Sequence, residues 1–364
     1  MRFFSTSALL LLVLALMSAC ASQTYSPPEL SPDRVAAFEA DRLDDAIGVQ
    51  IGRLKRGHQL LWPLLAANGE LCPKKRFSMG LLMSDREALG RDLRGITASQ
   101  LAAHGVPDHA FALDVMEGGP AFQAGLRGGD RLIGIEGKNF ETITDLRKAL
   151  SEKLKKGKAF TLAYQRNGVP GEADITSVEI CDAGLKVVNG DTMNAYAGTS
   201  TITLYAGLMR VMDDDALQFI LAHELAHVAL RHVRKGTRNV IVSGAVIYVP
   251  VLALLGDGAD ALLGRVDKSR EVSLRAKALA LAPGIESFEA EADYVGLYML
   301  ARGGGNLDGA MKAFEIFARE KPKSIWLRYT HPLTPERLAA SKAAMVEIGA
   351  KKLGGEALLP ERVR

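Results

Sequence analysis

The sequence has little net charge and few cysteines. Its 45 Lys and Arg residues and 42 Asp and Glu residues leave a net charge of +3 over 364 residues. Proteins that bind the phosphates of nucleic acids usually have many more basic than acidic residues. The near-equal numbers in this chain do not indicate a nucleic-acid partner. The three cysteines include no Cys-x-x-Cys pair, which argues against a cysteine-based zinc site. The sequence also lacks a convincing internal repeat.

Length and composition indicate a folded protein of more than one domain. Hydrophobic residues make up 48% of the chain and charged residues 24%, so it can bury sizeable cores. A chain of 364 residues is long enough for two domains preceded by a signal segment.

The most informative pattern is His223-Glu224-Leu225-Ala226-His227. Two histidines four residues apart on a helix lie on one face, about one turn apart, so both imidazoles can reach one metal ion. Glu224 lies beside the first histidine, where it can polarise a bound water. The pattern predicts a zinc site with two ligands and a general base. The alternative is an ordinary buried helix whose histidines bind no metal.

The surrounding residues predict a helix here. Residues 213–215 are aspartates, which supply N-cap oxygens and negative charge for the first turn. Apolar residues then recur at helical spacing: Leu217, Ile220, Leu221, Leu225 and Val228. Basic side chains near the expected C-terminus interact favourably with the negative end of the helix dipole: Arg231, His232, Arg234 and Lys235. Gly236 can end the helix.

A catalytic zinc usually has three protein ligands, so a third is expected from another helix. Glu289 and Asp293 lie four residues apart downstream and share a helical face. The small residues Ala292 and Gly296 would let this second helix approach the first closely. We assign Glu289 as the third ligand and Asp293 as the carboxylate that orients a ligand histidine. Glu291 lies on a different face and is the weaker candidate.

The two motifs together resemble those of the gluzincin metallopeptidases of the HtpX and CAAX-prenyl-protease (Ste24-like) type. The segments 194–197, 202–208 and 330–332, together with Arg337, resemble other parts of that family in the same order. The resemblance covers about residues 183–345. It implies an α+β fold, with a mainly helical metallopeptidase domain and a small β-sheet.

The same resemblance implies a zinc endopeptidase with one Zn²⁺ per chain. Its ligands would be His223, His227 and Glu289, and Glu224 would be the catalytic base. His331 lies next to a proline in the late motif and has three possible roles. It stabilises the oxyanion of the tetrahedral intermediate, or it occupies the open zinc position and keeps the enzyme latent, or it caps the helix that begins at Thr334.

The beginning of the chain predicts export from the cytoplasm. Arg2 precedes a short apolar run at residues 8–17, which is typical of a signal peptide and too short for a membrane-spanning helix. The run ends in Leu16-Met17-Ser18-Ala19-Cys20, which resembles the bacterial lipobox. This resemblance implies a signal peptide over residues 1–19.

The lipobox also implies how the mature protein is held. Cys20 would carry the lipid, and residues 20–32 would form a tether between the lipid and the fold. Ala21 follows the cysteine, which by the same resemblance favours the outer membrane of the cell envelope, facing the periplasm. The alternative is cleavage after Ala19 to give a soluble periplasmic protein.

A second signature lies in the middle of the chain. The pattern Pro-Ala-x-x-Ala-Gly-Leu-x-x-Gly-Asp at residues 120–130 resembles that of bacterial PDZ domains, and we place this β-barrel or sandwich domain at 99–182. A helix at 144–150 would line its groove, and a strand at 160–166 would end in the Asn167-Gly168 turn.

PDZ domains bind an extended peptide as an added strand, often through its C-terminus. Two positions suit the loop that would bind the peptide carboxylate, Gly95-Ile96 and Gly105-Val106. The alternative is a PDZ domain that acts as a spacer.

Cys72 and Cys181 flank this middle domain. In an oxidising compartment such an even pair suits a disulfide between the two connections to the main body; separate free thiols are the alternative.

The remaining segments complete the predicted domain order. Residues 33–98 would form the first part of the peptidase domain, 183–348 its main part, and 349–364 a C-terminal tail. The PDZ domain would then be an insertion. Residues 239–256 carry no charge and reach the threshold length of a membrane-spanning helix. We expect them to rest on the membrane or to cover the cleft, and a core helix is the alternative.

Two functions are compatible with this organisation. The first is a membrane-anchored zinc endopeptidase that cleaves misfolded envelope proteins, with the PDZ domain presenting or sensing them. The second is a chaperone or adaptor that uses the PDZ domain and a latent peptidase fold for binding. An adaptor would be expected to have another residue in place of a zinc ligand or of Glu224. The sequence retains all of these residues.

Overall fold

The protein is described by a computed structural model that covers residues 28–93, 95–236, 285–320, 331 and 334–362. The predicted lipobox with Cys20 and the uncharged segment 239–256 lie outside the described residues. Within the described ranges, no helix is long and apolar enough to cross a membrane. The chain divides into two compact units, Met1–Ala46 and Ile47–Arg364.

The described part of the first unit is mostly helical. Helix α2 (Pro32–Ala67) begins there with a proline followed by Asp33, which suits a helix N-terminus. Its side chains in this unit are mostly exposed, including Phe38 at 64%.

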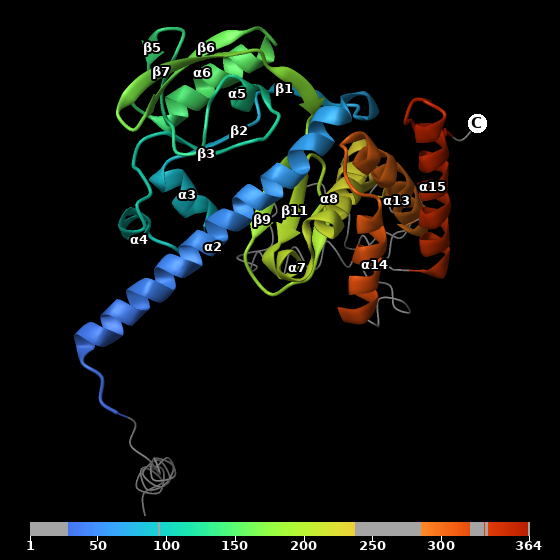
Figure 1. The fold of residues 1–364 in the computed structure, drawn as a ribbon, viewed down its shortest axis with the longest axis horizontal. Coiled ribbons are helices and arrows are strands. Elements are labelled where there is room, and N and C mark those ends of the chain that lie inside the picture. Colours follow the sequence, from blue (N-terminus) through green and yellow to red (C-terminus); the bar gives the residue numbers. More distant parts are fainter. Residues whose placement is uncertain (1–27, 94, 237–284, 321–330, 332–333, 363–364) are drawn as a thin grey trace, which may run out of the picture. The chain divides into compact units, whose positions relative to one another are not determined.

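The second unit contains two hydrophobic cores, and the first belongs to an antiparallel sheet with the strand order β2-β3-β4-β6-β7. Its strands are β2 (Leu81–Ser84), β3 (Phe111–Val115), β4 (Arg131–Ile135), β6 (Phe160–Arg166) and β7 (Val169–Ile175), and the short β5 (Lys138–Asn139) pairs with β4. The helices of this region are α3 (Arg86–Asp92), α4 (Ala98–Ala103), α5 (Pro120–Gln123) and α6 (Ile143–Lys155). Figure 1 shows them around the sheet.

Local sequence signals explain these elements. The Thr142 side chain accepts a hydrogen bond from the Asp145 amide and begins α6, which buries Leu146 and Leu150 against the sheet. Asn167 and Gly168 have φ values of 51° and 82°, the left-handed pair of a tight hairpin between β6 and β7.

The sheet starts earlier than the predicted domain boundary at residue 99. Strand β2 pairs with β3, with Leu81 opposite Val115. The helical patterns of residues 33–98 predict that this whole segment belongs to the peptidase domain. A four-residue strand directly followed by α3 gives too little alternation to stand out from those patterns.

The second core belongs to a mainly helical region with a three-stranded sheet. The sheet has the order β10-β11-β9, with β9 (Gly184–Val188), β10 (Ala195–Ala197) and β11 (Thr201–Tyr205). Its helices are α7 (Ala206–Val211), α8 (Asp214–Ala229), α13 (Ile285–Arg302), α14 (Asp308–Glu320) and α15 (Pro335–Leu353). Helix α8 packs against α13 and α14 (Figure 1). The predicted α+β class, with a helical domain interrupted by a β-domain, is confirmed.

The chain enters and leaves the β-domain at one place. Strand β1 (Lys75–Ser78) pairs with β8 (Val178–Cys181), and a Cys72–Cys181 disulfide with Cα atoms 5.4 Å apart lies at the end of this pair. A short 3₁₀ helix, Gly69–Leu71, leads into Cys72. The β-domain is therefore connected through two adjacent strands.

The C-terminal half of α2 contacts both cores. The Trp62 ring lies against Gly80 and Gly119 of the β-domain, where an added Cβ atom would approach the ring to 3.1 and 3.2 Å. The Arg56 side chain donates hydrogen bonds to the carbonyls of Met209 and Met212 in the helical region. This half of α2 is thus shared by the two domains.

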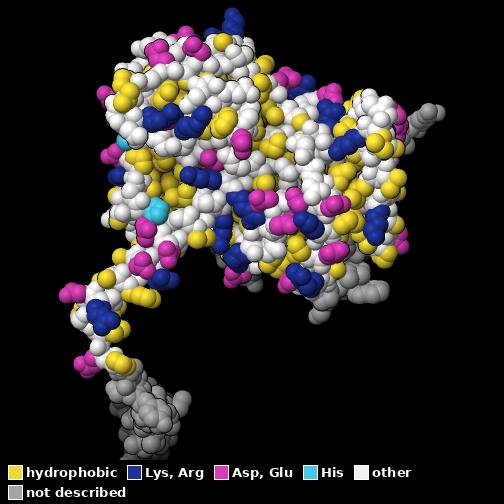
Figure 2. Space-filling view, viewed as in Figure 1, with side chains coloured by type: hydrophobic (Ala, Val, Ile, Leu, Met, Phe, Trp, Pro, Cys, Tyr) yellow, Lys and Arg dark blue, Asp and Glu magenta, His cyan; other side chains and the backbone are white. Residues whose placement is uncertain are grey.

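The C-terminal segment is held against the helical region. The Lys351 ammonium bonds to the Leu359 carbonyl and the Glu361 carboxylate, and Arg302 donates to the Leu358 carbonyl. Over the whole visible face, acidic and basic side chains are interspersed (Figure 2).

Candidate metal centre

Helix α8 is fixed at its N-terminus by charged side chains. The Asp213 carboxylate accepts a hydrogen bond of 2.9 Å from the Ala216 amide, as an N-cap does. The Lys312 ammonium of α14 lies 2.9 Å from Asp213 and 2.7 Å from Asp215. Most side chains of α8 are buried, which suits a helix enclosed by its neighbours.

The second predicted helix, α13, approaches α8 closely. A Cβ atom on Gly296 would lie 3.1 Å from the Cα and N atoms of His223. Ala292, about one helical turn before Gly296, is fully buried. The small residues of α13 therefore let the two helix backbones come close together at the first histidine of the motif.

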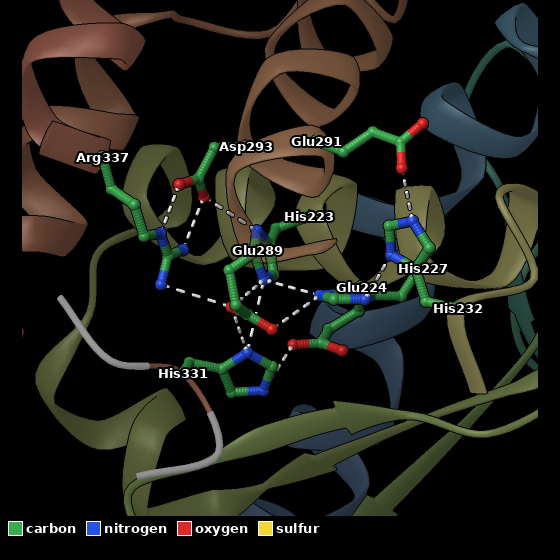
Figure 3. A network of polar contacts seen from close by, with 9 residues as sticks. All are labelled: His223, Glu224, His227, His232, Glu289, Glu291, Asp293, His331 and Arg337. Atoms are coloured by element: carbon green, nitrogen blue, oxygen red, sulfur yellow. Dashed lines mark hydrogen bonds and ion pairs between the residues drawn. The ribbon is translucent and has the colours of Figure 1, made fainter. Parts of the chain in front are cut away.

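Four side chains place potential metal-binding atoms within 4.8 Å of one another: those of His223, His227, Glu289 and His331 (Figure 3). The Nε2 atoms of His223 and His227 are 3.1 Å apart. The Glu289 carboxylate lies 3.4 Å from His223 Nε2 and 3.3 Å from His227 Nε2. The structure thus brings together the three predicted ligands.

His331 also belongs to this group. Its Nδ1 lies 2.8 Å from Glu289 Oε2 and 3.4 Å from His223 Nε2, and its Nε2 lies 3.5 Å from Glu224 Oε1. The helix-capping role considered for His331 is wrong, because the Thr334 side chain accepts the hydrogen bond from the Arg337 amide and caps α15.

The donor set fits a zinc ion. Three imidazole nitrogens and a carboxylate oxygen are the ligand types that zinc prefers, and they converge here in a buried site. In the described part of the chain, Glu224 Oε2 and His331 Nε2 are buried without a hydrogen-bond partner. Buried polar atoms normally have partners, so these two indicate that the site is built for a bound group.

A second layer of contacts orients His223. The Asp293 carboxylate lies 2.9 Å from its Nδ1. The Arg337 guanidinium holds that carboxylate with two hydrogen bonds, of 2.6 and 2.8 Å, and lies 3.2 Å from Glu289. Arg337 is only 6% exposed. Its place in a segment that resembles the peptidase family does not by itself predict this role.

His227 has a partner that the sequence analysis missed. The Nδ1 of His232 lies 2.9 Å from the Nδ1 of His227, and the Nε2 of His232 lies 3.0 Å from the Glu291 carboxylate. His232 was interpreted as a helix-end cation, but it is buried. Glu291, the weaker candidate ligand, lies outside the ligand group and contacts His232 instead. The five-residue spacing from His227 to His232 was the available signal.

The charges of the cluster are strongly coupled. Burial opposes a charge on His223, yet its hydrogen bonds to Asp293 and Glu289 raise its pKa to about 10. Burial also acts against the Glu289 carboxylate, but the charges on His331 and His227 hold its pKa well below the usual range. Burial, with the charge on His227, lowers the pKa of His232 to about 3. The buried carboxylates and imidazoles of this cluster therefore shift one another's pKa values.

Comparison with known proteins identifies both regions. Residues 171–344 match Peptidase family M48, and residues 79–176 match the PDZ domain. The chain combines an M48 domain with a PDZ domain. The resemblance to HtpX-type gluzincins is thereby confirmed at the level of the family, and so is the inserted PDZ domain.

Curated relatives resemble parts of the chain. It is 29% identical over 168 residues to "Metalloprotease LoiP" of Escherichia coli K12, a match that covers 46% of this chain and 64% of the relative. It is 28% identical over 167 residues to "Beta-barrel assembly-enhancing protease" of Yersinia pestis, with 43% of this chain and 33% of the relative covered. A "Protease HtpX homolog" of Bacteroides fragilis is 32% identical over 75 residues, covering 19% of this chain and 23% of the relative. The chain therefore matches less than two thirds of each of these relatives.

Proposed function

We propose that the protein is a zinc-dependent endopeptidase of the bacterial cell envelope that cleaves misfolded envelope proteins. The observation that carries this proposal is the convergence of His223, His227 and Glu289 in one buried cluster, with Glu224 beside it. The names of two relatives, a metalloprotease and a β-barrel assembly-enhancing protease, support the activity and an envelope substrate.

His223, His227 and Glu289 would hold one zinc ion per chain, with Asp293 fixing the orientation of His223. A bound zinc ion supplies Lewis-acid chemistry, which polarises the scissile carbonyl and lowers the pKa of a water molecule. Glu224 is the general base. Its Oε2 atom is buried and has no partner among the described residues, so it is available to take a proton and return it to the leaving amine.

His331 is assigned as a fourth ligand rather than an oxyanion stabiliser. Its Nδ1 is as close to Glu289 and His223 as these groups are to each other. In this position it would keep the enzyme latent until the loop moves. His331→Ala should then raise the rate of peptide hydrolysis, whereas loss of an oxyanion donor would lower it about 100-fold or more.

The PDZ domain would present or sense the substrate at β2, an edge strand of its sheet. Gly80, with φ at +69°, lies directly before this strand. The two loops predicted to bind a carboxylate instead flank α4, so Met79-Gly80 is the better candidate. The Arg147 side chain of α6 donates a 2.9 Å hydrogen bond to the Met83 carbonyl of β2, and a peptide at this edge would compete with it.

The alternative is a chaperone or adaptor that binds through the PDZ domain and a latent peptidase fold. The complete set of ligands and base favours the enzyme, because binding alone needs neither.

Glu224→Gln tests the proposal directly. Full-length protein carrying this change should cleave an unfolded model substrate at least about 100-fold more slowly, while its zinc content stays near that of the wild type. Glu315→Gln, an exposed change on α14, is the matched control. Full cellular function of the Glu224→Gln form would favour the adaptor, whereas undiminished cleavage would show that Glu224 is not the catalytic base. Proteomics of cells carrying the Glu224→Gln form would identify trapped substrates.

Membrane attachment through a lipid on Cys20, in the outer membrane and facing the periplasm, is part of the proposal. Cys20→Ala should release the protein from membranes into the soluble fraction. Continued tight attachment would instead point to residues 239–256.

A further inference from the structure

The imidazoles of His227 and His232 form a relay that leads away from the metal cluster. The His227 Nδ1 lies 2.9 Å from the His232 Nδ1, and the His232 Nε2 lies 3.0 Å from the Glu291 carboxylate (Figure 3). Glu291 is 43% exposed, so the relay runs from the buried cluster to the protein surface.

The geometry allows one consistent placement of protons along this relay. His227 must present a lone pair on Nε2 to a metal ion, so its single N–H lies on Nδ1. That N–H donates to Nδ1 of His232, which must then carry its own proton on Nε2. The His232 Nε2–H in turn donates to Glu291. Each nitrogen and the carboxylate oxygen is thereby used once.

We propose that His232 is a positioning residue for the metal site, and that Glu291 is the terminal acceptor of its hydrogen bond. His232 holds His227 in the tautomer and ring orientation that a metal ion requires. The inference rests on the proposed function only in taking His227 as a ligand; it does not depend on peptide hydrolysis.

Two features of the fold hold His232 in this place. Its ring stacks on Phe288, with centroids 4.6 Å apart and an interplanar angle of 15°, and it is 3% exposed. Arg231, directly before it, has a φ of +57°, which is strained for a residue with a side chain. The left-handed turn at the end of α8 therefore directs His232 back toward His227.

The two ligand histidines are supported differently. His223 contacts a carboxylate directly, that of Asp293, whereas His227 contacts a neutral imidazole with a carboxylate one step further on. We expect the direct carboxylate to increase the basicity of its histidine more strongly. The His232 relay then contributes mainly orientation.

Zinc affinity of the full-length protein, measured by competition with a chromogenic chelator, tests this role. His232→Phe keeps a ring on Phe288 and removes both nitrogens, and should weaken zinc binding about 10- to 100-fold. His232→Gln offers an amide oxygen to His227 and should restore part of the affinity. His58→Phe, which removes a largely buried histidine of α2 outside the site, is the control.

A spectroscopic readout separates positioning from a merely structural role. In the zinc-loaded protein, nitrogen NMR of the histidine rings should detect a His227 Nδ1–H that exchanges slowly with water, and this signal should be lost in His232→Phe. If His232→Phe does not fold, Glu291→Ala provides the test, with a smaller loss of affinity, about tenfold or less.

Wild-type zinc affinity in the folded His232→Phe protein, or in Glu291→Ala if only that variant folds, would overturn the inference. If zinc binding depends on His232 but no substrate is cleaved, even by the His331→Ala variant, the result would support the inference and contradict the proposed function.

Discussion

The two domains differ in how many charged side chains they bury and in how these are paired. The core of the PDZ domain is apolar, and its buried Asp130 is paired with Arg166 through hydrogen bonds of 2.7 and 2.8 Å. The M48 domain instead buries a connected group of titratable side chains beside its apolar core: His223, Glu224, His227, His232, Glu289, Asp293 and Arg337.

This difference indicates that the two cores are stabilised in different ways. A single paired carboxylate is compatible with a domain that is stable through apolar burial. A cluster of buried carboxylates and imidazoles is unfavourable for stability unless a cation or protons balance it. The M48 core therefore depends on its ligand in a way that the PDZ core does not.

Removal of the metal should have the largest effect and should act on one domain only. Dialysis against a strong chelator should abolish peptide hydrolysis, and zinc should restore it. A ligand at a thousand times its Kd stabilises the folded state by about 4 kcal/mol, so the M48 domain should become more labile. Hydrogen exchange measures both domains at once. Equal loss of protection in β3 and in α8 would contradict the comparison.

Arg337→Met should give the second largest effect. It removes the guanidinium that lies beside the buried carboxylates of Asp293 and Glu289, and breaking a buried pair costs about 3–5 kcal/mol. Urea unfolding of the metal-free protein provides the measurement. Arg319→Met, on the surface of α14, is the matched control, and equal stability of the two variants would show that Arg337 does not balance the cluster.

Asp130→Asn should have a smaller effect that is confined to the PDZ domain. It removes the charge paired with Arg166, and we expect a loss of about 1–3 kcal/mol. Zinc affinity should stay that of the wild type. Glu172→Gln, an exposed change on β7, should leave stability unchanged. A zinc defect in Asp130→Asn would mean that the two cores are coupled.

The smallest effect should arise at the helix that both domains share. Burial lowers the pKa of His58 on α2 below its ordinary value of 6.5. As the pH falls through 6.5, the unfolded chain takes up a proton that the folded protein does not, so stability decreases toward low pH. His58→Gln should flatten this slope between about pH 7 and pH 5 in thermal unfolding. Parallel pH profiles for the two proteins would contradict this assignment.

Much of the site could be predicted from sequence because it is built on helices. The spacing of His223 and His227, and of Glu289 and Asp293, follows from helical periodicity alone, and the small Gly296 indicates the close contact of the two helices. Contacts made after a turn of the chain could not be predicted in this way. His232 lies beyond the left-handed residue Arg231, and no periodic pattern extends through such a turn.

The fold was predictable at the level of domains and less so at their edges. The PDZ motif identified its helix and hairpin, but the first strand of the sheet is only four residues long and was assigned to the neighbouring domain. The shared role of α2 was also not visible, because an apolar face does not reveal which of two cores it contacts.

The disulfide between Cys72 and Cys181 has a consequence for the covalent continuity of the molecule. It spans 109 positions of the chain, and the segment that it closes contains the PDZ domain. A protease that cuts the PDZ domain once would therefore leave α2 joined to the M48 domain. Because α2 packs against that domain, a nicked molecule would keep its peptidase half in one piece until the bond is reduced.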